Sequence, residues 1–139
     1  MKSADNIVDV TVDNLGKVFV IDSEGTIFNI SGSKLGKQFY KTDLGDNCRI
    51  EGFNNGSQLI FTLNSKGELF EISSNNKKTF ENSLYGVDLC VEFKSTLYLA
   101  TSSGIFAKKA AASNFTKVSD EKVSSIGCAW VLWFIGIDG

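Results

Sequence analysis

Hydrophobic and polar positions form one pattern that occurs three times along the chain and begins a fourth time. Each copy contains a run of β-branched, aliphatic and aromatic residues, followed by a short polar turn that ends at a glycine. The runs lie at 18–22, 59–63, 97–101 and 131–135, and the glycines are Gly25, Gly67, Gly104 and Gly139. Such runs predict β-strands, and a glycine at the end of a tight turn supplies the positive φ that a hairpin requires.

Further strands are predicted on both sides of each run. Segments 27–30, 69–72 and 105–107 predict a strand after the glycine, and segments 7–13, 48–54 and 86–92 predict one before the hydrophobic run. A more polar strand is predicted at 37–41, 77–81 and 114–118. This polarity suits an outer edge strand, because it discourages pairing with other chains.

Repeats of about 40 residues with four antiparallel strands are typical of β-propeller blades. We therefore expect an all-β chain of about three and a half blades, at 5–45, 46–83, 84–121 and, incompletely, 122–139. The first strand of each blade would line a central channel. The alternative is a β-sandwich or small barrel of about a dozen strands. No segment predicts a helix, and 108–113 is expected to form a loop.

The fourth repeat stops at the turn that precedes its third strand. Propellers have about four to eight blades, and each blade buries its faces against its neighbours, so these repeats cannot close a ring. We expect the chain to be a fragment of a larger, six-bladed propeller, or to be completed by a second polypeptide or a second copy. Residues 131–137 would be buried against a strand from that additional protein.

Composition and charge exclude several functions. The formal net charge of the 139 residues is −2, and the 14 Lys and Arg residues are scattered, so no nucleic-acid partner is expected. The basic pairs at 77–78 and 108–109 are interpreted as solvated loop charge. No apolar run reaches the ~20 residues that span a bilayer, and residues 1–10 contain no signal-peptide core. The absence of His removes the common nucleophile systems, which favours a protein that is not an enzyme.

Three cysteines, Cys48, Cys90 and Cys128, lie in apolar strand-like runs. None belongs to a CxxC pair, so a zinc knuckle is not indicated. They can be buried as small hydrophobic residues, or two of them can form a disulfide and leave one free thiol. The disulfide would fit a secreted chain.

Candidate chemistry lies on the predicted inner strands, which carry Asp9, Glu51 and Asp88. Carboxylates can hold a divalent cation at the mouth of a propeller channel. Asp9 and Asp88 each lie nine residues before the second strand, where the second blade carries Ile50. Glu51 is then out of register and on the opposite strand face, so no metal site is predicted. Arg49 is interpreted as an internal ion-pair partner, or as an anchor for an anionic ligand.

Two aromatic residues depart from the repeat pattern in connecting segments, namely Tyr85 and Trp130. Such residues are candidates for ligand contact, although packing is the alternative for Trp130. Phe28, Phe70 and Phe106 recur at one position in each repeat and are expected to pack between blades.

Three N-x-S/T sequons begin at Asn29, Asn55 and Asn114. They fall at predicted strand ends and turns, where a secreted protein could carry glycans. Asn55 is the best candidate, because it lies in a sharp turn.

The strings "LGKVFVIDSEGTIF", "GSQLIFTLNSKGELF" and "SLYGVDLCVEFKSTLYLATSSGIF" resemble blades of six-bladed propellers. That group includes the SMP-30/gluconolactonase, NHL, Yellow/royal-jelly and insect ommochrome-binding proteins, and the last type is the most similar in character. This resemblance implies a secreted, non-catalytic binding propeller without a cofactor, which carries a small aromatic or pigment-like ligand at the channel mouth. The alternatives are a metal-dependent lactonase or esterase that uses Asp9 and Asp88, and a protein–protein interaction scaffold.

Overall fold

The hydrophobic runs form β-strands in the computed structural model, which describes residues 6–32, 34–42, 47–73, 77–79, 84–92, 95–128 and 132–136. The first sheet contains β1 (Ile7–Val12), β2 (Val18–Asp22), β3 (Thr26–Ser31) and β4 (Lys34–Lys41). The second contains β5 (Asn47–Asn54), β6 (Gln58–Asn64), β7 (Leu69–Ile72) and β8 (Lys77–Thr79). The third contains β9 (Gly86–Val91), β10 (Thr96–Thr101), β11 (Gly104–Lys109) and β12 (Thr116–Ser119), and a last pair contains β13 (Val123–Cys128) and β14 (Leu132–Gly136).

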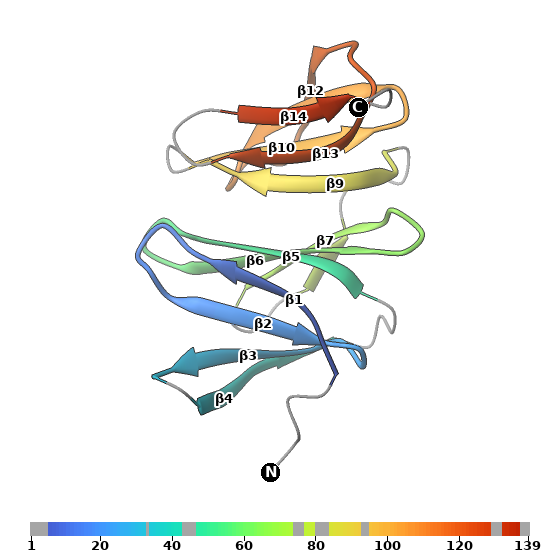
Figure 1. Ribbon diagram of the computed structural model, residues 1–139. Coiled ribbons are helices and arrows are strands. Elements are labelled where there is room, and N and C mark those ends of the chain that lie inside the picture. The colour runs from blue at the N-terminus through green and yellow to red at the C-terminus, as the bar shows by residue number, and fades with distance from the viewer. Residues whose placement is uncertain are drawn as a thin grey trace.

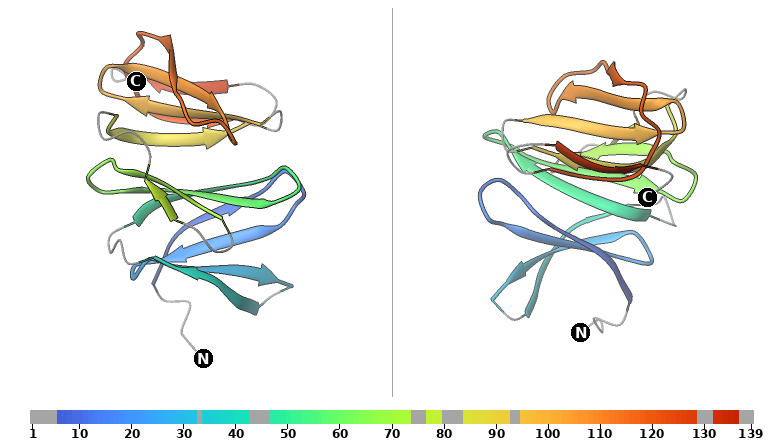
Figure 2. Two further views of the ribbon diagram at one scale, coloured as in Figure 1. Left: turned by 180° about the vertical axis from the view of Figure 1, so that it is seen from behind. Right: turned by 45° about the horizontal axis from the view of Figure 1, so that its top comes forward.

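Each strand pairs antiparallel with the next strand along the chain, and no described strand joins a sheet formed by another repeat. The first three sheets lie in chain order from the N-terminal end, and the β13–β14 pair lies beside the third sheet (Figure 1). Two further views show the same order of the first three sheets (Figure 2). This arrangement confirms the predicted blades of four antiparallel strands and excludes the sandwich and the barrel. No helix long and apolar enough to cross a membrane occurs in the described ranges.

The hairpin glycines that the structure describes, Gly25, Gly67 and Gly104, have the predicted positive φ. Gly67 has φ 82°, and its N–H donates to the Asn64 carbonyl at 3.0 Å. Its own carbonyl accepts the N–H of Gly86 at 2.8 Å, so this turn also links the second sheet to the third. A Cβ at Gly67 would lie 2.8 Å from the Gly86 carbonyl oxygen. Glycine is required there by both the positive φ and the close approach of the two backbones.

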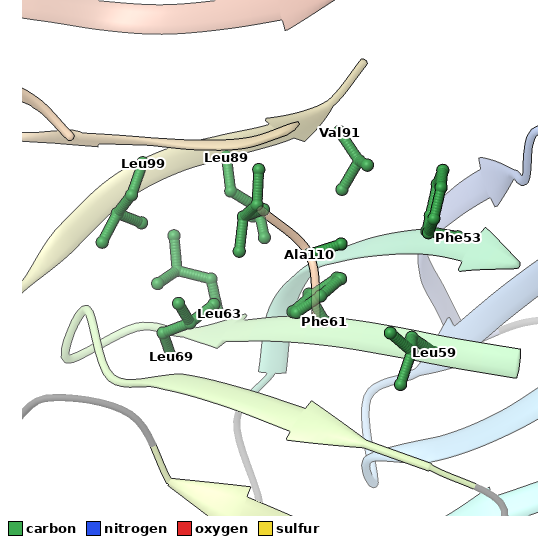
Figure 3. Packing of buried hydrophobic residues seen from close by; sticks show 10 residues of the cluster. Phe53, Leu59, Phe61, Leu63, Leu69, Leu89, Val91, Leu99 and Ala110 are labelled. Carbon is green, nitrogen blue, oxygen red and sulfur yellow. The ribbon is translucent and has the colours of Figure 1, made fainter. Parts of the chain in front are cut away.

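Apolar side chains between successive sheets form three clusters. The largest joins the second sheet to the third and includes Phe61, Leu63, Leu89 and Leu99, all buried (Figure 3). A second cluster joins the first two sheets, and a third joins the third sheet to β13. Burying one Leu, Ile or Phe side chain contributes about 1.5–3 kcal/mol, so these contacts hold the sheets together face to face.

The aromatic rings inside the clusters come mainly from the second strand of a sheet. Phe19 and Phe61 are completely buried there. Of the phenylalanines expected between blades, Phe70 is buried and Phe28 and Phe106 are half-buried, and none of them belongs to the three clusters. Other residues of the third strands contribute to the clusters instead, namely Ile27, Leu69 and Ile105.

The prediction that Lys108 carries solvated loop charge is wrong. Strand β11 extends through this residue, and its side chain is completely buried between the second and third sheets. Its Nζ donates to the carbonyls of Ala110 at 3.1 Å and Ala112 at 2.7 Å, lies 3.7 Å from Glu71, and sits over two phenylalanine rings. These partners make burial of the charge tolerable. The side chains of 77–78 lie outside the described residues.

A disulfide joins Cys90 on β9 to Cys128 on β13, with Cα atoms 5.9 Å apart. It links the third sheet to the last strand pair. Of the two alternatives for the cysteines, the structure therefore contains the disulfide. The side chain of Cys48 lies outside the described residues.

Candidate functional site

The first strands of the four sheets, β1, β5, β9 and β13, share one irregularity. In each of them the pairing with the second strand shifts by one residue, after Ile7, Asn47, Gly86 and Val123. After each shift, the regular pairing begins again at one residue of the first strand. That residue lies opposite the position four residues before the hairpin glycine. In chain order these residues are Asp9, Arg49, Asp88 and Ser125. A bulge of this kind redirects the side chain beside it. The repeat therefore brings four polar residues to one level across four adjacent strands.

Arg49 lies at the centre of this level and contacts three carboxylates. Its Nε is 3.1 Å from Asp9 Oδ2 and its Nη2 is 3.3 Å from Glu51 Oε1, while Nη1 donates to Asp88 Oδ1. The Asp88 side chain is only 4% exposed, whereas Asp9 and Glu51 are each 21% exposed and Arg49 is 33% exposed. We call Asp9, Arg49, Glu51 and Asp88 the Arg49 cluster. The single guanidinium of Arg49 thus forms ion pairs with acidic side chains from three sheets.

The two aspartates of the cluster also hold the first strand of the following sheet. Asp9 Oδ2 accepts the backbone N–H of Ile50 at 2.8 Å, and Asp88 Oδ2 accepts the N–H of Ile126 at 3.0 Å. Ser125 Oγ adds a hydrogen bond to Asp88 Oδ2 at 3.1 Å. The same carboxylate-to-backbone contact therefore occurs at the first and third junctions between sheets. Hydrogen bonds to charged acceptors are stronger than neutral ones, so these contacts fix the spacing of the strands.

Glu51 has the least favourable environment of the acidic groups. Burial raises the pKa of Glu51 from 4.5 to about 7, although Arg49 and a hydrogen bond from Thr11 favour its ionised form. Thr11 Oγ1 donates to Glu51 Oε2 at 3.2 Å, and accepts the N–H of Gly52 at 3.2 Å. Burial lowers the pKa of the Arg49 guanidinium, but the three carboxylates more than offset this effect and the pKa is raised overall. Arg49 therefore keeps its charge, while Glu51 exchanges a proton near neutral pH.

The structure brings four of the predicted residues together, but in a different register from the one expected. Ile50 was expected to be equivalent to Asp9 and Asp88, with Glu51 on the opposite face. The turn between β5 and β6 is shorter than the turn between β1 and β2, because Asn54 pairs with Gln58 whereas Val12 pairs with Val18. The pairing therefore makes Arg49, which lies opposite Leu63, the residue equivalent to Asp9. The predicted strand face of Glu51 is therefore wrong, because Glu51 lies two residues beyond Arg49 on the same face and contacts it.

The remaining predicted positions lie elsewhere. Tyr85 is 58% exposed just before β9, and its Cβ faces the Gly67 turn rather than the Arg49 cluster. Trp130 lies outside the described residues. Asn55 and Asn114 are exposed, whereas the amide oxygen of Asn29 is buried beside Gly36. Glycosylation stays a prediction.

Sequence reasoning missed Ser125 and Thr11 as members of this region. A count from the hairpin glycine that fits Asp9 and Asp88 does not reach Ser125, which only the pairing of β13 with β14 identifies. No periodic signal marks Thr11, whose role depends on the approach of β1 to β5.

The chemistry of the cluster is that of an internally paired ion network. The N–H groups of the Arg49 guanidinium donate to the three carboxylates. The positive charge that pairs with these acids is therefore a side chain of the protein itself. In the part of the chain that the structure describes, no group of His, Cys, Asp and Glu is arranged to hold a metal ion.

Comparison with known proteins identifies the fold. No protein-family model matches the chain, and no curated protein matches it. Among solved structures, the chain is similar to the β-propeller domain of Cps50 (Swd1) from Myceliophteria thermophila, with 9% sequence identity and a TM-score of 0.64 over 95% of this chain. It is also similar to a chain of the nidogen/laminin complex, with 13% identity and a TM-score of 0.68 over 93% of this chain.

A third similar structure is virginiamycin B lyase from Staphylococcus aureus with quinupristin, with 12% identity and a TM-score of 0.68 over 98% of this chain. The matches cover 50%, 55% and 51% of the three solved chains. The chain thus spans about half the length of the propellers that it matches. At these identities the comparison shows the fold alone: the chain forms part of a β-propeller.

Proposed function

We propose that the chain is one arc of a non-catalytic binding propeller, which further polypeptide completes and which binds its ligand where the inner strands meet. The observation that supports this proposal is the Arg49 cluster. It gathers charged side chains from three sheets at one level of the inner strands, and three of these side chains stay 21–33% exposed. Propeller ligands commonly bind at such a convergence of strands and loops.

The charge of the cluster favours one ligand class. Three carboxylates face one guanidinium, so the cluster has an excess of negative charge whether or not Glu51 is protonated. The N–H groups of Arg49 already donate to these acids, which leaves this residue poorly suited to anchor an anion. We expect a small aromatic ligand that is cationic or uncharged. Tyr85, which lies beside the Gly67 turn, and Trp130, which lies outside the described residues, stay predictions as aromatic contacts.

Catalysis of the lactonase type has less support. It would require Asp9 and Asp88 to hold a metal, but both are bound to Arg49 and to backbone N–H groups of the following sheet. Releasing them would break the junctions between sheets.

Secretion is part of the same proposal. The disulfide between Cys90 and Cys128 supports it, because such bonds persist in oxidising compartments.

A thermal-shift assay with three indole compounds tests the proposed ligand class. Tryptamine is cationic, indole is uncharged and indole-3-acetate is anionic, while the ring is the same. A ligand that binds only the folded state raises Tm, so we expect tryptamine and indole to raise it and indole-3-acetate to leave it unchanged. Asp9→Asn keeps an oxygen for the Ile50 N–H and should reduce the effect of tryptamine. A larger shift with indole-3-acetate, or calcium-dependent lactone hydrolysis, would contradict the proposal.

A further inference from the structure

Two positions of the repeat point from each sheet towards the next, and we call them the forward face. Counted from the hairpin glycine, the residue six positions earlier is aromatic in every repeat: Phe19, Phe61, Tyr98 and Trp133. The residue four positions earlier is apolar in every repeat: Ile21, Leu63, Ala100 and Ile135. In the first three repeats these residues belong to, or pack against, the clusters between sheets.

The last sheet exposes its forward face. Trp133 is 63% exposed, whereas its equivalents Phe19 and Phe61 are completely buried. Ile135 is 56% exposed, whereas its equivalent Leu63 is 2% exposed. The aromatic residue that is completely buried in the first two repeats, and partly buried as Tyr98 in the third, is thus left in water in the fourth.

The first sheet shows the complementary exposure on the opposite face, which we call the rear face. Val10 and Val12 follow Asp9 as Leu89 and Val91 follow Asp88. Leu89 and Val91 are 0% and 7% exposed because they pack against the preceding sheet. Val10 and Val12 are each 56% exposed. The described chain therefore ends in a forward face on one side and a rear face on the other.

The forward face of the last sheet is hollowed. Trp133, Ile135, Gly127 and Ser125 line a shallow cavity of about 210 Å³, together with Ile126. A Cβ placed on Gly127 would meet nothing within 4 Å. Pockets for drug-sized ligands are about 300–1,000 Å³, so this cavity suits protruding side chains of another protein surface.

We propose that the forward face of β13–β14 binds the rear face of the first sheet, Val10 and Val12, in a second copy of this chain. This inference rests on the proposed completion of the ring. All three junctions inside the chain pair a forward face with a rear face, and one copy supplies both of the faces left exposed. The chain also spans about half of the solved propellers that it matches, so two copies would supply one full circle. Such a contact is head-to-tail, and it closes into a ring of two copies because each copy spans about half of the circle.

Sedimentation velocity on the 139-residue chain and its variants tests this interface. The wild type should be a dimer at micromolar concentrations. Trp133→Asp and Val12→Asp each place a charge on one exposed face, and either should weaken dimerisation by at least about tenfold, as expected at the centre of an interface. Val118→Asp is the matched control, because Val118 is 53% exposed on the outer strand β12 and belongs to neither face. Far-UV circular dichroism checks that every variant retains its strands.

Mixing the two defective variants gives the decisive result. Trp133→Asp keeps an intact rear face and Val12→Asp keeps an intact forward face, so the mixture should form a dimer with one sound interface. A forward-to-forward dimer would instead be insensitive to Val12→Asp and would gain nothing from mixing. Either that pattern or a monomeric wild type at about 100 μM would overturn the inference. A monomer that still responds to tryptamine would leave the proposed ligand function standing.

Discussion

Replacing Glu51 by glutamine tests which of two opposing effects, burial or the charge of Arg49, determines the pKa of Glu51. Burial favours the protonated acid, whereas Arg49 favours the carboxylate, and Asp9 and Asp88 add further negative charge nearby. If burial dominates, the pKa of Glu51 in the folded protein is about 7, against 4.5 in the unfolded chain. The folded state then binds this proton more tightly than the unfolded state does. The contribution of Glu51 to the free energy of unfolding is therefore fully present below about pH 4.5 and is lost as the pH rises to about 7.

The size of this loss follows from the two pKa values. A tenfold change in proton affinity corresponds to about 1.4 kcal/mol, so a rise from 4.5 to about 7 corresponds to about 3 kcal/mol. Glutamine has the shape of the protonated acid and cannot ionise. The stability of Glu51→Gln relative to wild type should thus increase by up to about 3 kcal/mol between about pH 4.5 and pH 8.

Urea unfolding followed by circular dichroism, at a series of pH values, measures this difference. Glu121→Gln is a suitable control, because Glu121 is exposed between β12 and β13 and should leave the difference from wild type independent of pH. The reasoning is refuted if Glu51→Gln becomes less stable relative to wild type as the pH rises. That result would mean that the ion pair with Arg49 outweighs the burial of the carboxyl group.

Three further predictions concern the junctions between sheets. Reducing the Cys90–Cys128 disulfide, or replacing both cysteines by serine, opens a loop with a sequence separation of 38. This change should lower the free energy of unfolding by about 4 kcal/mol, as measured by denaturation with and without reductant. Lys108→Met removes a charge that pairs with a buried network and should cost about 3 kcal/mol in the same assay, whereas no change would show that the network is dispensable. Gly67→Ala should lower Tm more than Gly16→Ala, since both have positive φ (82° and 83°) but only Gly67 lies against another backbone; equal losses would contradict the steric argument.

Strand order and blade architecture could be predicted because they depend on local signals. Alternating apolar residues and a turn glycine occur within a few positions of each other, and the glycine at Gly67 has the conformation that the pattern requires. Each sheet is a continuous stretch of chain, so pairing partners are sequence neighbours. The fold is therefore accessible from the order of short patterns.

The contacts of the site depended on a different kind of information. A difference in the length of the turn between the first and second strands changes which residue is equivalent to Asp9. A slip of one position exchanges the two faces of a strand. Counting along the sequence made Ile50 the equivalent of Asp9, whereas the strand pairing, with its bulges, makes Arg49 the equivalent residue. The prediction for Lys108 was wrong for a related reason. Its neighbours Glu71 and Phe61 belong to another sheet, and no residue near Lys108 in the sequence indicates this contact. Contacts across sheets are set by packing, which local periodicity does not encode.

The covalent link between β9 and β13 has a consequence for how the last hairpin can act. A two-stranded ribbon is only marginally stable in water by itself. Anchored through Cys128 to a complete sheet, the ribbon keeps its orientation before any other surface meets it. Binding of another protein surface to the ribbon then requires little ordering of the chain. A reducing environment would remove this preorganisation without changing the apolar side chains that the ribbon exposes.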